Sequence, residues 1–417
     1  MAVEDTASPR VLAKIVYAGA CSAGFVAASR DLAQLADLSI SSERVRRACS
    51  HAAADRIDHQ QQQQKAFQQK PLLEQTQQKP ADVEAPDIAC VMADGGRYQQ
   101  LDRSDGAVGS RSARKGEHWK ESRIGLLAEM TGKQYAEDPQ PELPPELRYD
   151  AMSETLSEIG HTGCKLDMGE EIVTDSELPN SPSSEGLPGP ELSRRHVVAS
   201  RQCWEDFGSL LASQAWYHGF FATPRGVFVS DGSPAIEKLQ KTHFRGFTSV
   251  ADLLHVLSYS LAAARAVSVD EAAARRKYDA WAAKIWKGQV DDVIDELIAY
   301  GTKFGEPPPD VSRDDPREVI RRSRVYYENH AERMDYPSYR RQGFPLTSSL
   351  MESTVKQVSR RVKGSEKFWS STGSEAILRL RGEYLSDDEP MKAHWKQRSK
   401  NAAGTRAYRS TGRAVTV

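Results

Sequence analysis

The stretch IACVMADGGRYQQL, residues 88–101, decides the fold class of this chain. Its first six residues are apolar, Asp94 and two glycines follow, and the rest is polar. A short apolar run bounded by a turn signal is typical of a buried strand, and we expect Asp94 at or near its end. Residues 117–130 and 194–202 are predicted as two further strands.

A second apolar run that ends in Asp-Gly lies further along the chain. Residues 224–239, PRGVFVSDGSPAIEKL, predict a short strand, Asp231 at its end, and then a helix. Residues 246–259 repeat this pattern with Asp252 and His255. From residue 258 to about residue 329 the composition favours helix throughout, with one break at Pro307–Pro309. Strands mixed with helices in this way predict an α/β fold.

The N-terminal part is predicted to be helical. Residues 9–57 give an Ala/Leu-rich helix, a short break, and a second helix that begins at Ser41 or Ser42. This spacing fits a helix-turn-helix that binds DNA, but it equally fits an ordinary helical hairpin. The cations of the second helix that would contact DNA are Arg44, Arg46 and Arg47.

Two segments have compositions typical of linkers. Residues 59–80 are rich in glutamine and end in proline, and we expect them to connect two domains without stable structure. Residues from about 134 to 193 are acidic and rich in proline, serine and glycine. We expect a largely disordered insertion there, with one short helix near residues 149–159.

Glu352 stands alone before a series of cations in GFPLTSSLMESTVKQVSRRVKGSEKFW, residues 343–369. It could complement a helix N-terminus while the cations form a solvated face. Alternatively, Glu352 holds a metal ion and the cations bind a polyanion. Trp369 could stack on a flipped base or pack in the core. The cations concerned are Lys356, Arg360, Arg361 and Lys363.

Asp94, Asp231 and Glu352 are the candidate catalytic acids. Asp-Gly is also a common turn dipeptide, so each acid alone has a purely structural explanation. Three converging carboxylates would repel one another unless a divalent cation lay between them. Hard oxygen ligands select Mg²⁺ or Mn²⁺, and one or two such ions could activate a nucleophile for phosphodiester chemistry.

The five cysteines are scattered without a C-x-x-C pair, which argues for a reducing compartment and against a zinc ribbon. The net charge is −2, but the last sixty or so residues are basic. No secretory signal and no apolar run long enough to cross a membrane are visible, so we expect a cytoplasmic protein.

The blocks ADGGRYQ (93–99), HWKESRIGLL (118–127), VSDGSPAI (229–236) and residues 326–381 resemble, in order and spacing, bacterial insertion-sequence transposases of the DDE type. The SSLMES context of Glu352 departs slightly from the glycine-containing form usual in that group. The resemblance covers about residues 87–385. It implies an RNase H-like mixed sheet flanked by helices, with Asp94, Asp231 and Glu352 as the catalytic metal ligands.

The composition of the terminal segments and the resemblance together predict a domain plan. A helix-turn-helix domain (1–57) and a Gln-rich linker (58–86) precede an RNase H-like core (87–257 and 343–385). An all-helical insertion (258–342) interrupts the core, and a basic tail (386–417) ends the chain. Asp252 and His255 match a small accessory motif of related transposases, although Asp252 could instead be the second catalytic acid.

The expected activity is cleavage at transposon ends and strand transfer, with Mg²⁺ or Mn²⁺ as cofactor. The expected partners are double-stranded DNA and at least one further copy of the chain in a synaptic complex, and the expected location is the bacterial nucleoid. Two alternatives stay open: an inactive, transposase-derived DNA-binding protein, and a nuclease on the same fold.

Overall fold

The structure is a computed structural model. It describes residues 7–100, 119–168, 189–364 and 367–402, apart from the side chains of 161–168 and 402. The strands are β1 (Ile88–Gln100), β2 (Trp119–Thr131), β3 (Glu191–Ser200), β4 (Gly226–Ser230), β5 (Thr248–Ala251) and β6 (Phe368–Trp369). The helices are α1 (Pro9–Cys21), α2 (Phe25–Ala36), α3 (Ser42–Gln68), α4 (Leu72–Gln77), α5 (Tyr149–Met168), α6 (Trp204–Tyr217), α7 (Pro234–His243), α8 (Leu253–Val267), α9 (Glu271–Trp286), α10 (Val290–Phe304), α11 (Pro316–His330), α12 (Tyr336–Gln342), α13 (Ser349–Val362), α14 (Ser371–Leu385) and α15 (Pro390–Ala402), with short 3-10 turns at Pro145–Leu147, Phe220–Ala222 and Ala331–Arg333.

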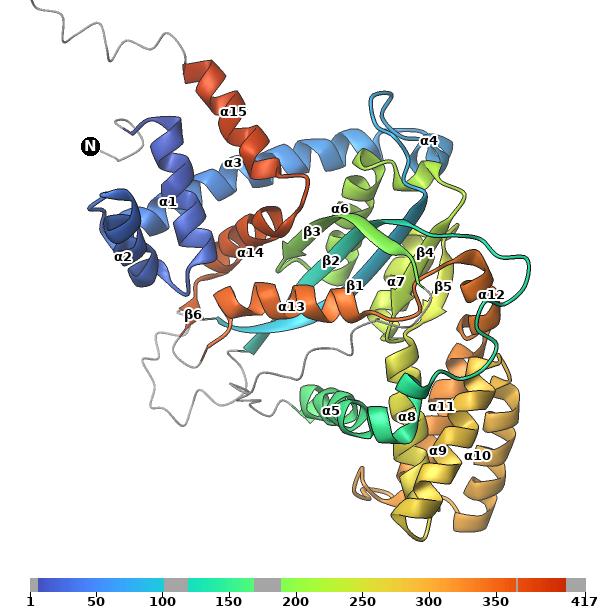
Figure 1. The fold of residues 1–417 in the computed structure, drawn as a ribbon. Coiled ribbons are helices and arrows are strands. Elements are labelled where there is room, and N and C mark those ends of the chain that lie inside the picture. Colours follow the sequence, from blue (N-terminus) through green and yellow to red (C-terminus); the bar gives the residue numbers. More distant parts are fainter. Residues whose placement is uncertain (1–6, 101–118, 169–188, 365–366, 403–417) are drawn as a thin grey trace, which may run out of the picture.

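One mixed sheet lies at the centre of the molecule (Figure 1). Its strand order is β3-β2-β1-β4-β5, and the short β6 pairs with the far end of β1. β1 is antiparallel to β2, and β2 to β3, whereas β1, β4 and β5 are mutually parallel. The predicted α/β class with a mixed sheet is therefore confirmed.

The two faces of the sheet are covered by different helices. Alternate residues of β1 point to opposite faces, as in any strand. Ala89, Val91 and Ala93 pack in a core with α6 and α7. Cys90 and Met92 belong to the larger core that also contains α13, α14 and the N-terminal helices. Asp94 has the parity of Cys90 and Met92, so it lies on the face that α13 covers.

β1 is longer than the sequence predicts. The strand does not stop at Asp94 but continues through both glycines to Gln100, and it pairs with β2 from Ile88 to Gln99. The glycines are used for close packing rather than for a turn. A Cβ on Gly95 would lie 2.5 Å from Glu121 Oε1, and one on Gly96 would lie 2.8 Å from Ser122 Oγ. Asp94 therefore sits within a strand.

Helices α8 to α11 form a lobe beyond the ends of β4 and β5, with α5 beside α8 (Figure 1). Tyrosine hydroxyls of α12, which follows this lobe in the chain, form hydrogen bonds with the sheet. Tyr336 donates a hydrogen bond to Ala251 O (2.9 Å), and Tyr339 donates one to Ser249 O (3.1 Å). These two tyrosines and Tyr327 are buried.

The predicted unstructured linker at residues 58–86 is wrong for its first twenty residues. α3 runs unbroken through the glutamine tract to Gln68, and α4 follows after two residues of turn and Pro71. Glutamine has a good helix propensity, and tertiary contacts supply the rest. Gln60 donates to Glu383 Oε1 (2.9 Å), and Phe67 is buried against the core of α6. The N-terminal helices accordingly share the main core instead of standing apart.

The predicted disordered insertion at about 134–193 is wrong in its first half. The helix expected near 149–159 begins at Tyr149 and extends to Met168, and Met152 and Leu156 are buried in the main core. Hydrophobic residues spaced along one face of this short segment were enough to dock it on α8 and α9. Residues 169–188 lie outside the described part of the chain, as do residues 403–417 of the predicted basic tail.

No helix in the described ranges is long and apolar enough to cross a membrane. The four cysteines whose side chains are described, Cys21, Cys49, Cys90 and Cys203, are free thiols.

Candidate metal centre beside β1 and β4

The register of two parallel strands brings Asp94 and Asp231 together. Met92 of β1 lies opposite Val229 of β4. Two residues further along come Asp94, within β1, and Asp231, directly after β4, next to the face of the sheet that Met92 and Val229 share. The sheet therefore fixes the backbone positions of both carboxylates side by side.

A tight turn orients Asp231 directly after β4. Its Oδ1 accepts a hydrogen bond from Ser233 N (2.9 Å), and its carbonyl oxygen accepts one from the Tyr326 hydroxyl (3.1 Å). Gly232 has φ +93°, and a Cβ there would lie 2.7 Å from His330 Nε2. Only glycine fits this turn without strain.

Glu352 reaches the same place from α13. It lies in the first turn of that helix, which packs on β1. Burial is the largest cause that raises the pKa of Asp94, from 3.8 to about 7, and the charges of Asp231 and Glu352 raise it further. The three acids predicted from the sequence thus act on one another electrostatically.

Asp252 and His255 border this acidic group. Asp252 is fully buried at the start of α8. One of its oxygens accepts hydrogen bonds from Leu254 N (3.3 Å) and Ser348 N (3.1 Å). The other accepts from Ser348 Oγ (3.0 Å) and pairs with His255 Nδ1. Both oxygens are already engaged, so Asp252 is better placed to position its neighbours than to act as the second catalytic acid.

His255 carries a positive charge at neutral pH. Burial lowers its pKa, but the hydrogen bond and charge of Asp252, with the charges of Asp231 and Glu352, outweigh burial and hold the pKa at about 9. In return, the His255 and Ser348 hydrogen bonds keep the pKa of Asp252 below its usual value despite burial. His255 offsets part of the negative charge, yet Asp94 still has a raised pKa.

The donor set fits a divalent metal ion. One ligand atom each from Asp252, His255 and Glu352 lies within 4.8 Å of the others. Because Asp252 is already hydrogen-bonded through both oxygens and His255 is protonated, the acids left to bind an ion are Glu352 and its neighbours Asp94 and Asp231. Burial raises the pKa of Asp94 most, and the negative charges of Asp231 and Glu352 add to the rise, so a bound cation would be favoured beside these carboxylates. The cluster could therefore hold a metal ion, through Asp94, Asp231 and Glu352 if the ion prefers oxygen ligands.

The cations predicted to bind DNA behind Glu352 divide into two groups. Arg360 is exposed, and Lys356 and Lys363 are half-buried. Burial, with the nearby charge of Arg97, lowers the pKa of Lys363. These three remain candidates for contacts with a polyanion.

Arg361 and Trp369 are packed inside the protein, so the prediction that they contact DNA is wrong. The Arg361 guanidinium lies between the rings of Phe25 (4.6 Å) and Trp369 (4.9 Å) and donates to Gly19 O (3.0 Å). Trp369 Nε1 donates to Val362 O (2.9 Å). The helical period of α13 places Arg361 one residue beyond an exposed cation, on the side that meets α1 and α2. Both side chains hold the N-terminal helices on the sheet.

The predicted DNA-contacting cations of α3 are exposed. Arg44, Arg46 and Arg47 lie at the start of the helix, where Ser41 provides the N-cap, and Arg46 and Arg47 pair with Glu43 at 2.7 and 3.5 Å. The helices α2 and α3 and their five-residue connection fit the predicted helix-turn-helix spacing. DNA binding by this surface stays a prediction.

Sequence reasoning missed Arg333, a buried cation beneath the site. Its guanidinium donates to Ser230 Oγ (2.7 Å), Val250 O (3.3 Å) and Glu237 Oε1 (2.7 Å). It thereby links the ends of β4 and β5 to α7, just before Asp231 and Asp252. No local pattern identifies this role, because its partners are 83 to 103 residues away in sequence.

Comparison of the sequence with models of known protein families and with curated proteins finds no match.

Proposed function

We propose that this protein is a DDE transposase with an RNase H-like core, which cleaves DNA at transposon ends and joins them to a target with Mg²⁺ or Mn²⁺ as cofactor. The proposal rests on the resemblance of four sequence blocks to insertion-sequence transposases and on the geometry of the acids. The strand order, three antiparallel strands followed by two parallel ones, fits the fold that the resemblance implies.

The observation that carries the proposal is that Asp94, Asp231 and Glu352 lie near enough for their charges to interact. They are far apart in sequence and come from a strand, a turn and a helix, yet after burial the charges of Asp231 and Glu352 both raise the pKa of Asp94. A divalent cation bound among the three carboxylates would remove this repulsion, which supports a metal-binding role over three unrelated structural ones.

Each residue would have a separate task. Asp94, Asp231 and Glu352 would hold one or two ions, which when bound would supply activation of water or a 3′-hydroxyl and stabilisation of the leaving oxygen. Asp94 would give up its proton as the ion binds. Asp252 would keep His255 oriented and protonated, so that His255 can donate a hydrogen bond to a phosphate oxygen. Lys356, Arg360 and Lys363 would contact the DNA backbone without reading its sequence.

The test uses a donor plasmid that carries the coding region with its natural flanking DNA and a separate target plasmid. Wild-type protein with Mg²⁺ or Mn²⁺ should release the element and produce joined molecules. Glu352→Gln should yield neither product while it still binds the donor ends, because the amide keeps the shape of the side chain but removes its charge.

Glu328→Gln is the matched control, since Glu328 is an exposed helical glutamate paired only weakly with Arg324 at 3.6 Å. It should behave like wild type. Cleavage without joined products would favour a nuclease, and end binding without any cleavage by wild type would favour an inactive DNA-binding protein. Full activity of Glu352→Gln would refute the assigned mechanism.

A further inference from the structure

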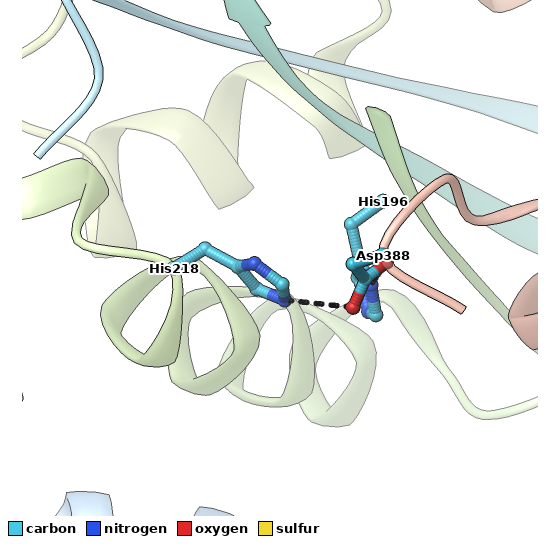
Figure 2. Close-up of side chains that lie close together, drawn as sticks. All are labelled: His196, His218 and Asp388. Atoms are coloured by element: carbon cyan, nitrogen blue, oxygen red, sulfur yellow. Dashed lines mark hydrogen bonds and ion pairs between the residues drawn. The ribbon is translucent and has the colours of Figure 1, made fainter. Parts of the chain in front are cut away.

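A second cluster of titratable side chains lies away from the acids. His196 is on β3, His218 directly follows α6, and Asp388 lies between α14 and α15 (Figure 2). His196 Nδ1 is 2.9 Å from Asp388 Oδ1, and His218 Nε2 is 3.9 Å from Asp388 Oδ2. One ligand atom of each residue lies within 4.8 Å of the other two.

The backbone around this cluster holds Asp388 in place. The segment before it runs along β3 and bonds to the neighbours of His196 on both sides. Val197 N donates to Ser386 Oγ (2.9 Å), Asp387 N donates to Arg195 O (2.9 Å), and Arg195 N donates to Asp387 Oδ2 (3.0 Å). The carboxylate is therefore fixed beside the histidines before any ligand arrives.

Hydrogen bonds among the described residues do not satisfy the cluster. His196 is 5% exposed, and its buried Nε2 has no hydrogen-bond partner in the described part of the chain. The two imidazole rings pack against each other with centroids 4.4 Å apart and planes 38° apart.

We propose that His196, His218 and Asp388 bind one divalent first-row transition ion, with Zn²⁺ as the best fit. Two imidazoles and one carboxylate are ligands that Zn²⁺ takes readily, and Mg²⁺ does not favour nitrogen. Tetrahedral ligands about 2.0–2.2 Å from the ion lie roughly 3.3–3.6 Å from one another. One ligand atom of each residue lies within 4.8 Å of the other two, so side-chain movements of about 1 Å would bring the three atoms to this spacing.

The bound ion would act as a clamp. It would join the edge strand β3, the end of α6 and the turn that leads into α15, which come from three separate parts of the chain. Three protein ligands leave a fourth position for water. This nitrogen-containing site would be chemically distinct from the acids beside β1 and β4, because softer ions select it while hard ions select the carboxylates.

The experiment titrates Zn²⁺ into the chelator-treated, full-length protein with Mg²⁺ in large excess, followed by calorimetry. Wild type should bind one equivalent. Asp388→Asn and His218→Gln should each weaken binding by at least about 100-fold, since loss of residues that merely support a ligand already costs 10–100-fold. His243→Gln, which changes a half-buried histidine outside the cluster, should bind like wild type.

Absorption spectra with Co²⁺, and zinc X-ray absorption on wild type alone, identify the ligands independently of whether the variants fold. Visible bands of four-coordinate Co²⁺ and scattering from two imidazoles are expected. Absence of Zn²⁺ binding by wild type would overturn the proposal and leave a hydrogen-bonded cluster only. Unchanged Zn²⁺ affinity in both folded variants, or a spectrum without imidazole ligands, would overturn it as well.

Discussion

Replacement of Asp94 by asparagine should stabilise the metal-free protein at neutral and alkaline pH. Asparagine keeps the oxygen that accepts the 2.6 Å hydrogen bond from Gly95 N, but it cannot ionise. The pKa of Asp94 is raised from 3.8 to about 7 in the folded protein, first by burial and then by Asp231. At about 1.36 kcal/mol per pH unit, this rise corresponds to roughly 4 kcal/mol at most. Water still reaches part of the side chain, so we expect a gain of about 2 kcal/mol.

The sign of the effect depends on pH. Below about pH 4 both the folded and the unfolded protein hold the proton, and Asp94 carries no electrostatic cost. Between about pH 4 and pH 7 the unfolded chain releases its proton first, so wild type loses stability as the pH rises through this window. Above about pH 7 Asp94 is ionised in both states, and the loss of stability in wild type has reached its full value. The advantage of Asp94→Asn should therefore be present at pH 8 and small at pH 4.

The assay is denaturant unfolding of wild type and Asp94→Asn in chelator at both pH values, repeated with Mg²⁺. Mg²⁺ should stabilise wild type and have little effect on the variant, because binding to the folded state alone shifts the unfolding equilibrium. Asp58→Asn, a change at an exposed position of α3, is the control and should alter neither. Equal or lower stability of Asp94→Asn at pH 8 in chelator would refute the electrostatic account of this site.

Three further outcomes follow from the packing. Arg361→Ala should lower the free energy of unfolding by about 2–4 kcal/mol, because it loses the Gly19 hydrogen bond and both ring contacts. Arg360→Ala, which changes the exposed neighbour, should leave stability unchanged. It should make duplex-DNA affinity less dependent on salt, by about one unit in the slope of log affinity against log salt concentration. If Arg360→Ala destabilised the protein and Arg361→Ala changed only the salt dependence, the two arginines would have been assigned wrongly. Gly232→Ala should lower the free energy of unfolding by about 1–3 kcal/mol and reduce metal-dependent cleavage, because φ is +93° and the new Cβ would meet His330. Stability and cleavage equal to wild type would show that this turn is not strained by a side chain. Full-length protein should unfold in one calorimetric transition, since α1 to α3 share the main core, and a separate N-terminal transition would contradict that.

The local pattern was sufficient to predict strands β1 to β5 and the helices that follow Asp231 and Asp252. Apolar runs such as the one before Asp231 are short, bounded by glycine, and rich in valine and phenylalanine, so their period and length indicate a strand. The same pattern misplaced Asp94 at a strand end, because β1 continues through two glycines that elsewhere would mark a turn. The length of β1 is set by its pairing with β2, and the sequence of one segment does not reveal such pairing.

The glutamine tract shows why composition alone misled. A glutamine side chain ends in a polar amide, and a tract of such residues alone would not form a core. In the folded protein Gln60 lies in a buried polar network with Glu383 and Arg379, residues more than 300 positions away. The stabilisation that this network gives to α3 depends on tertiary contacts, so it cannot be predicted from the composition of the segment alone.

The sequence indicated the three acids of the candidate site, but not the residues that pack around it. Asp94, Asp231 and Glu352 stood out by their turn and helix contexts, whereas Arg361 looked like its exposed neighbour Arg360 because both belong to one basic run. Which face of α13 meets the N-terminal helices is a property of the assembled molecule. His196, His218 and Asp388 gave no sequence signal, since their spacing matches no metal-binding motif.

Asp252 has a consequence for how this chain can change over evolutionary time. Its carboxylate caps α8 and also binds Ser348, 96 residues later, so the two ends of the helical lobe are fastened to one buried point. Insertions or deletions on the far side of the lobe would then be absorbed between fixed ends, without moving His255 or Glu352. Such a lobe can be enlarged, shortened or recruited for a new partner while the chemistry beside it stays the same.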